Sequence, residues 1–418
     1  MMCEGHTMSN DEKILRELAK EYREASLTDR NIRNKQLQIG VNDLHMTRPI
    51  ILIDELPWHE LNGSGELTLQ CEDEYLKGIE RQMRQQLYRW RHIPGDMVIP
   101  DAVRVEKVIH SSGMGLEVKE DTIPTGEGSS VSAHRFYDQM ADESCLEKIH
   151  NEEITYDKEE SERRYDLVRN IIGDITPVRL VGDQWCFDTL WDDVARLHGV
   201  GQILMDLIER PEYMHDIAEK LTGVFLDKVR QYEELNLFEG AQDSLHCTAA
   251  YTNDLPSGDF DGAHYKAKDV WGRGAAQVFV SVSPAMRDEF DIPYMSRAME
   301  PFGLVYYGCC EPLDKQIDIV EKIPHLRKIT VTPWANYENA AEKIGKKYVY
   351  SAKASAASVA LGKVNEDTLR AELKTITDAA YKNGCNFELV LKDVSTVSHH
   401  PEHLETWLRI AREFIPED

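Results

Sequence analysis

The last third of the chain repeats one pattern four times: a short apolar run, a polar turn and an amphipathic helical segment. The apolar runs cover residues 303–308, 328–332, 347–351 and 386–391. Strands that alternate with helices predict a parallel sheet with crossover helices. In such folds the reactive groups lie just beyond the carboxyl ends of the strands. The residues that follow each run are therefore the first candidates for chemistry.

Earlier parts of the chain contain further runs with the apolar character of strands. These runs are residues 49–53, 97–105, 177–183 and, with a weaker pattern, 241–247. Eight strands, each followed by a helical segment, favour a closed (β/α)8 TIM barrel of the α/β class. The sequence thus predicts one large barrel with insertions.

The domain organisation follows from the same pattern. Ser9 and Glu12 have the spacing of a capping box at the start of a helix, and we expect an N-terminal helical extension over residues 1–45. The barrel is expected over 46–418. A polar stretch over about 111–165, rich in Gly, Ser and Glu, is expected to be a long insertion.

Composition excludes two classes of partner. The chain has 48 Lys and Arg against 74 Asp and Glu, a formal net charge of −26, which repels nucleic acid. No apolar run approaches the roughly 20 residues of a membrane span. The eight cysteines are scattered, and the N-terminus lacks the features of a secretory signal, so we expect reduced thiols and a cytoplasmic location.

Three residues at predicted strand ends are candidate metal ligands. Cys309 and Cys310 follow the run 303–308, and His246 lies near the end of 241–247. Zinc accepts thiolate and imidazole ligands, so a zinc site is predicted here. The alternatives are that the thiols are small buried residues and that His246 is a hydrogen-bonded core histidine.

Two acidic residues are candidate catalytic groups. Glu311 adjoins the cysteine pair, and Asp393 follows the run 386–391. A carboxyl group with a pKa raised by burial can donate a proton to a leaving group. The alternative for Asp393 is a loop carboxylate that caps the next helix.

Five residues near predicted strand ends are candidates for substrate binding. Aromatic rings at the mouth of a pocket can stack on a flat ligand, although such rings are often part of the core, and charged groups can fix its orientation. The candidates are Asp183, Trp185, Tyr307, Trp334 and Lys353.

Several longer motifs resemble the uroporphyrinogen decarboxylase superfamily over residues of about 160 to 412. The similar segments are 199–217 (GVGQILMDLIERPEYMHDI), 283–294 (SPAMRDEFDIPY), 401–405 (PEHLE) and the short segment 48–51 (RPII). The resemblance implies a barrel and one of two activities, which are cofactor-free decarboxylation of a tetrapyrrole and zinc-dependent methyl transfer involving corrinoid proteins or thiols.

The motifs are closer to the methyltransferase branch. The decarboxylase branch carries an arginine-rich N-terminal segment, whereas residues 53–60 (IDELPWHE) offer carboxylates. The methyltransferase branch has His-x-Cys after the fifth strand, and here Cys309 matches the cysteine while Tyr307 stands in place of the histidine. His246 is expected to supply the imidazole that Tyr307 does not, and the family's further cysteine after the eighth strand is absent from residues 392–395 (KDVS).

The function expected from these observations is methyl transfer with a corrinoid protein. The methyl donor would be a small molecule such as a methoxylated aromatic compound or a methylamine, zinc would activate the leaving group, and a partner protein would carry cobalamin. A cofactor-free decarboxylase or lyase that uses Lys353, Lys392 and Arg273 is an alternative, as is a ligand-binding barrel without catalysis. A homodimer is also expected, because closed homo-oligomers are common.

Overall fold

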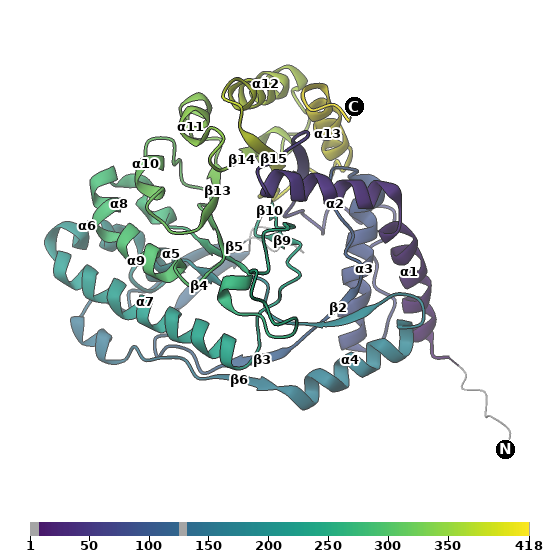
Figure 1. Ribbon diagram of the computed structural model, residues 1–418, viewed down its shortest axis with the longest axis horizontal. Helices are drawn as coiled ribbons and strands as arrows, with labels where there is room; N and C mark the ends of the chain where they lie inside the picture. The colour runs from purple at the N-terminus through teal and green to yellow at the C-terminus, as the bar shows by residue number, and fades with distance from the viewer. Residues whose placement is uncertain (1–7, 125–131, 418) are drawn as a thin grey trace.

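A computed structural model describes residues 8–124 and 132–417 of the chain (Figure 1). Its largest sheet has seven parallel strands in the order β1-β15-β14-β13-β12-β11-β8. Their bounds are β1 (Ile50–Ile53), β8 (Phe187–Asp188), β11 (Trp271–Gly274), β12 (Leu304–Tyr307), β13 (Leu326–Val331), β14 (Val349–Ala354) and β15 (Asn386–Leu391). The four apolar runs of the last third of the chain form β12 to β15.

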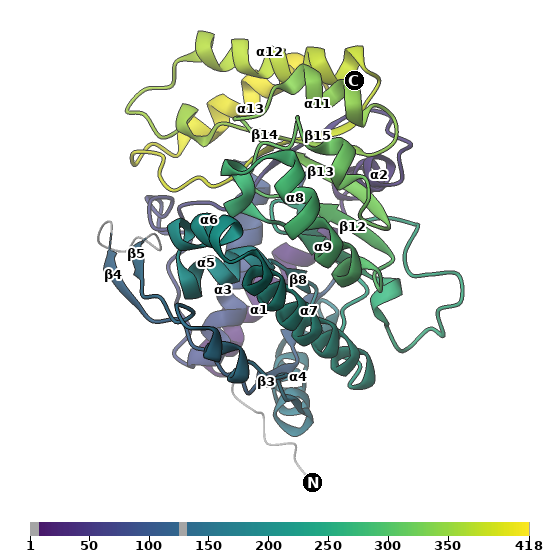
Figure 2. The ribbon, with the colours of Figure 1, turned by 90° about the vertical axis from the view of Figure 1, so that its left-hand side faces the viewer.

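Helices cover the outer face of this sheet, as Figures 1 and 2 show. Most of these helices carry an apolar face that packs on the strands in one core, which includes Val305 of β12, Ile329 of β13 and Trp407 of α13. The helices around the sheet are α7 (Pro211–Glu234), α8 (Pro284–Phe290), α9 (Ile292–Met299), α10 (Ile317–Val320), α11 (Tyr337–Ile344), α12 (Glu366–Lys382) and α13 (Glu402–Phe414).

A second, two-stranded parallel sheet pairs β2 (Val103–Glu106) with β7 (Val178–Val181). Single interactions connect it to the rest of the fold: the Asp96 amide donates to the Ile51 carbonyl at 2.8 Å, and Asp183 forms an isolated bridge with Phe238. Within the described part of the chain no continuous ladder links this pair to either edge of the larger sheet. The structure therefore establishes an α/β fold with a seven-stranded parallel sheet.

The prediction for the fourth strand was wrong. Residues 241–247 do not enter the large sheet, and part of them forms a small antiparallel hairpin of β9 (Ser244–Leu245) and β10 (Thr248–Ala249). The strand between β8 and β12 in the large sheet is instead β11, whose sequence Trp-Gly-Arg-Gly lacks an apolar run. A Cβ atom on Gly272 would approach the Phe302 ring to 2.6 Å, so close packing explains a glycine where strands usually have larger residues.

The described α-helices that precede β7 in the chain are α1 (Asn10–Ser26), α2 (Asp29–Asn42), α3 (Glu74–His92) and α4 (Lys158–Ile172). Helices α3 and α4 pack against the strand pair of β2 and β7, α1 packs on α3 and α4, and α2 packs against β1 and β15 of the large sheet. Ser9 caps α1, and its reciprocal hydrogen bonds with Glu12 form the predicted capping box. The predicted strand 97–105 is shorter than expected, because only its last residues belong to β2.

The segment predicted as an insertion contains two antiparallel strand pairs. Strand β3 (Val108–Ser111) pairs with β6 (Ile154–Asp157), and β4 (Glu120–Pro124) pairs with β5 (Ser132–Phe136). The remaining elements are η1 (Glu143–Glu147), α5 (Leu190–His198), α6 (Val200–Glu209), η2 (Ala267–Asp269), η3 (Gln277–Ser281) and η4 (Ala356–Ser358). The division into extension, barrel and insertion stays a prediction. None of the described helices is both long and apolar enough to cross a membrane.

Candidate active site at the strand ends

The hairpin β9–β10 lies near the centre of the molecule, where buried charges of the large sheet hold it (Figure 1). Lys328 donates to the Thr248 hydroxyl at 2.6 Å and to the Ala249 carbonyl at 2.8 Å. Lys353 donates to the Cys247 carbonyl at 2.5 Å. Glu388 lies 3.3 Å from the Lys328 ammonium, and all three charged side chains are fully buried. A two-residue ladder is too short to be stable alone, so these bonds fix the hairpin.

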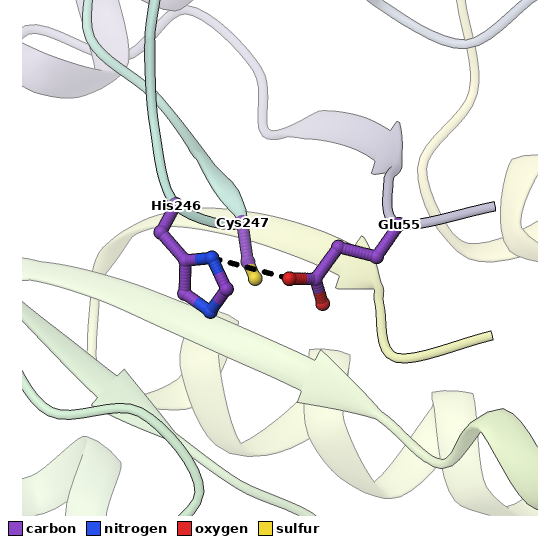
Figure 3. A group of neighbouring side chains, drawn as sticks. All are labelled: Glu55, His246 and Cys247. Atoms are coloured by element: carbon purple, nitrogen blue, oxygen red, sulfur yellow. Dashed lines mark ion pairs between the residues drawn. The ribbon is translucent and has the colours of Figure 1, made fainter. Parts of the chain in front are cut away.

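The turn of the hairpin presents His246 and Cys247 to Glu55, which follows β1 (Figure 3). The His246 Nδ1 atom is 3.1 Å from a Glu55 carboxylate oxygen. Within residues 8–124 and 132–417, these three form the one group of at least three His, Cys, Asp or Glu whose ligand atoms all lie within 4.8 Å of one another. A carboxylate, an imidazole and a thiol form a donor set suited to zinc.

Three residues of the site have a left-handed backbone. The φ angles are 52° at Glu55, 61° at Cys247 and 56° at Asp393. This region is costly for residues other than glycine and persists where the surrounding structure enforces it, as at functional sites. The backbone conformation thus orients these three side chains, and holding it costs conformational free energy at each residue.

Cys309 and Cys310 lie beside this group and contact Lys392. The Lys392 ammonium is 3.6 Å from the Cys309 sulfur and 3.3 Å from the Cys310 sulfur, and the two sulfurs are 3.7 Å apart. A hydrogen bond from Cys310 lowers the pKa of Cys309 to about 3 against the effect of burial, with further help from His246 and Lys392. The same bond raises the pKa of Cys310, so Cys309 is the thiolate of the pair.

Glu55 and Asp393 shift each other's pKa in opposite directions. Burial, and then the hydrogen bond with Asp393, raises the pKa of Glu55. Burial opposes ionisation of Asp393, but the bond with Glu55 and the Lys392 ammonium, 2.9 Å away, lower the pKa of Asp393. The group with the raised pKa is therefore Glu55, and Asp393 is its anionic partner.

Glu311 and Tyr307 lie on the inner side of the cysteine loop. Both Glu311 oxygens accept backbone hydrogen bonds, one from Cys309 at 2.9 Å and one from Ala276 at 3.2 Å. Tyr307 is fully buried, and its hydroxyl lies 2.6 Å from both Arg287 and Asp291. In this structure Glu311 fixes the Cys309 backbone, and Tyr307 belongs to a buried ionic network.

A cavity of about 470 Å³ lies at the carboxyl ends of β2 and β7. Asp183 and Trp185, two of the predicted substrate-binding residues, line it. Trp185 stacks on Phe187 at 6.0 Å between ring centroids, and Phe187 meets His246 edge to face at 6.5 Å. Gln86 belongs to the walls of this cavity and of a smaller one that reaches Cys247. The cavity therefore adjoins the group around His246.

The other two predicted substrate residues lie elsewhere. Trp334 follows β13, and 77% of its surface is exposed. Lys353 is fully buried and holds the hairpin, as described above. The roles of Lys328 and Glu388 were missed in the sequence, although a charge inside each apolar run was a signal of a buried polar network.

Comparisons with known proteins leave the family open. No family model matches the chain, and no curated protein does. One solved structure, a methyltransferase from Methanosarcina mazei, has a TM-score of 0.50 at 11% identity, and the match covers 91% of this chain and 98% of the other. At this identity the likeness shows a shared fold.

A buried carboxyl group at the end of β8 should make stability depend on pH. Burial raises the pKa of Asp188 from its ordinary 3.8 to about 7. The folded protein then retains a proton that the unfolded chain releases, so this group's contribution to stability falls as pH rises from 4 to 7. Asp188→Asn should leave stability at pH 4 unchanged and raise it by about 2–4 kcal/mol at pH 8. Urea unfolding at both pH values, with the exposed Asp367→Asn as control, tests this.

Proposed function

We propose that the protein is a methyltransferase that takes a methyl group from a small substrate and passes it to a cobalamin carried by a corrinoid protein. The observation that carries the proposal is the convergence of Glu55, His246 and Cys247 beside a cavity of about 470 Å³. The shared fold with a solved methyltransferase supports it. We also propose that the strands close into a (β/α)8 barrel of the uroporphyrinogen decarboxylase superfamily, in a cytoplasmic protein.

The donor set fits a zinc ion. Zn–N, Zn–O and Zn–S bonds of roughly 2.0–2.3 Å place tetrahedral ligand atoms about 3.3–3.8 Å apart, which is compatible with a group whose ligand atoms all lie within 4.8 Å of one another. Glu55, His246 and Cys247 would hold the ion and leave a fourth position open, as in catalytic zinc sites. Bound zinc supplies a Lewis acid that makes a heteroatom a better leaving group.

The chain's own residues supply the remaining requirements of methyl transfer. Trp185 offers a flat surface for an aromatic or cationic methyl donor in the cavity, and Asp183 offers it a negative charge. Lys392, close to Cys309 and Cys310, contributes positive charge beside the site, where a departing alkoxide, phenoxide or amine develops negative charge or needs a proton. Burial and the neighbouring Asp393 raise the pKa of Glu55, which favours a role as proton donor when Glu55 is not a ligand.

The alternatives predict different products. A cofactor-free decarboxylase would use Lys392 and Arg273, both buried near Cys309, to bind a carboxylate. A binding protein without catalysis would bind ligands in the cavity and turn none over. The fold alone is compatible with all three functions.

The test is a methyl-transfer assay with purified protein, zinc, a reduced corrinoid protein and a panel of methoxylated aromatic compounds and methylamines. Formation of methylcobalamin, followed by its absorbance, is expected with at least one donor. Chelation should abolish the reaction, and added zinc should restore it. Release of CO₂ from carboxylated analogues in the presence of chelator would instead establish the decarboxylase. Binding without turnover would establish the binding protein.

A further inference from the structure

We propose that Cys309 and Cys310 form a reversible disulfide when the protein meets a hydroperoxide, and that this pair is an oxidative modification site. The proposal is independent of the methyl-transfer function. It rests on the placement of two neighbouring sulfurs and one ammonium group at the strand ends.

The two sulfurs are arranged for sequential reaction. They lie 3.7 Å apart, and the Lys392 ammonium contacts both. Cys310 is partly exposed, while Cys309 is buried behind it with a 6% exposed surface. A cationic, partly accessible environment is where cysteines react, and a second thiol within reach resolves the first product.

The other described cysteines lack this arrangement. Cys71, Cys145, Cys186, Cys247 and Cys385 are all buried, whereas the 309–310 pair includes the partly exposed Cys310. Burial raises the pKa of Cys71, Cys186 and Cys385 to about 12, which disfavours the reactive thiolate. Oxidation should therefore select the 309–310 pair.

The chemistry balances in two steps. The Cys309 thiolate attacks one peroxide oxygen and the O–O bond breaks, so that Cys309 becomes a sulfenic acid and the departing hydroxide takes a proton from solvent to form water. The Cys310 sulfur then attacks the Cys309 sulfur, the S–O bond breaks, and the hydroxyl leaves as a second water with the Cys310 proton. Two thiols lose two electrons in total, and the hydroperoxide gains them.

Neighbouring residues make this disulfide easy to reverse. Consecutive Cα atoms are about 3.8 Å apart, below the usual 4.4–6.8 Å span of disulfides, so the bond is strained. Strained disulfides are readily reduced by thiols. The oxidised pair would also withdraw both sulfurs from Lys392, which makes the modification a switch for the adjacent site.

The experiment uses the full chain, treated with chelator and then with limiting hydrogen peroxide. Trypsin releases residues 298–315, which contain no other cysteine. This peptide is expected to lose the mass of two hydrogen atoms, to resist alkylation, and to recover both thiols on brief exposure to dithiothreitol. Intact peptide thiols after peroxide, or a disulfide that joins either residue to another cysteine, would overturn the proposal.

Variants distinguish the two oxidation steps without an assay of methyl transfer. Cys310→Ser should stop at the sulfenic acid, so that residues 298–315 gain one oxygen atom and react with a 1,3-dione probe. Lys392→Met should slow oxidation about tenfold, whereas Lys322→Met, which removes an exposed lysine, should not change it. Equal oxidation rates in both lysine variants would show that Lys392 has no part in the reaction and refute that step.

Discussion

A Glu388→Met variant is expected to be less stable than the wild-type protein by about 3–5 kcal/mol, because removal of one partner from a buried ionic cluster leaves the others uncompensated. Glu388 is fully buried between Lys328, 3.3 Å away, and Lys353, 3.9 Å away. It also accepts hydrogen bonds from Ser351 and Thr248. Urea unfolding at pH 7 measures the loss.

The control for this variant replaces the whole cluster. A Lys328→Met, Lys353→Met, Glu388→Met triple variant should recover most of the lost stability, since apolar replacement of an entire buried ion group is often neutral. It should nevertheless release the hairpin that presents His246, because the bonds to the Cys247 and Ala249 carbonyls are gone. Faster amide exchange in residues 244–249 alone would show this. A triple variant as unstable as the single one would refute the charge argument.

An exposed acidic residue provides the comparison for the size of the stability loss expected in Glu388→Met. Glu338 on α11 pairs with Lys382 at the surface, where 48% of its side chain is exposed. Its replacement by Met should change stability by no more than about 1 kcal/mol. The difference between Glu388 and Glu338 then measures the effect of burial on a carboxylate with a lysine partner.

The strands of the last third could be predicted because the residues that make each strand buried are neighbours in the sequence. Residues such as Val305, Ile329 and Leu389 stand in short runs of mainly apolar residues, which form buried parallel strands. Strand β11 was not predictable, because the need for Gly272 arises from Phe302, and the need for Gly274 from Met295, in other elements. Contacts between elements carry no local signal in a single sequence.

Only some features of the candidate site could be predicted from the sequence. The position of Cys309 and Asp393 at strand ends could be inferred from the alternation of strands and helices. The approach of His246 to Glu55 could not, because it depends on a hairpin held by Lys328 and Lys353 from inside the sheet. The sequence predicted His246, Cys309 and Cys310 as ligands, and that set stays a prediction; the structure brings His246 together with Glu55 and Cys247.

His246→Ala is expected to weaken zinc binding and methyl transfer together, each by about 100-fold or more. The imidazole is the only nitrogen donor of the Glu55–His246–Cys247 group, and even loss of an outer-sphere partner lowers metal affinity by roughly 10–100-fold. Competition with a chromogenic chelator measures the affinity, and methylcobalamin formation measures the reaction.

The matched control is His400→Ala, which removes an exposed histidine paired with Glu402 and should alter neither quantity.

Glu55→Gln separates the two roles open to Glu55. If Glu55 ligates zinc, affinity falls because an amide is a weaker ligand than a carboxylate. If Glu55 instead donates a proton, zinc affinity stays near wild type while the reaction loses the alkaline limb of its pH profile, because the acid whose deprotonation slows the reaction at higher pH is gone. Unchanged zinc affinity in His246→Ala would remove the metal from this group and, with it, the proposed activation of the leaving group.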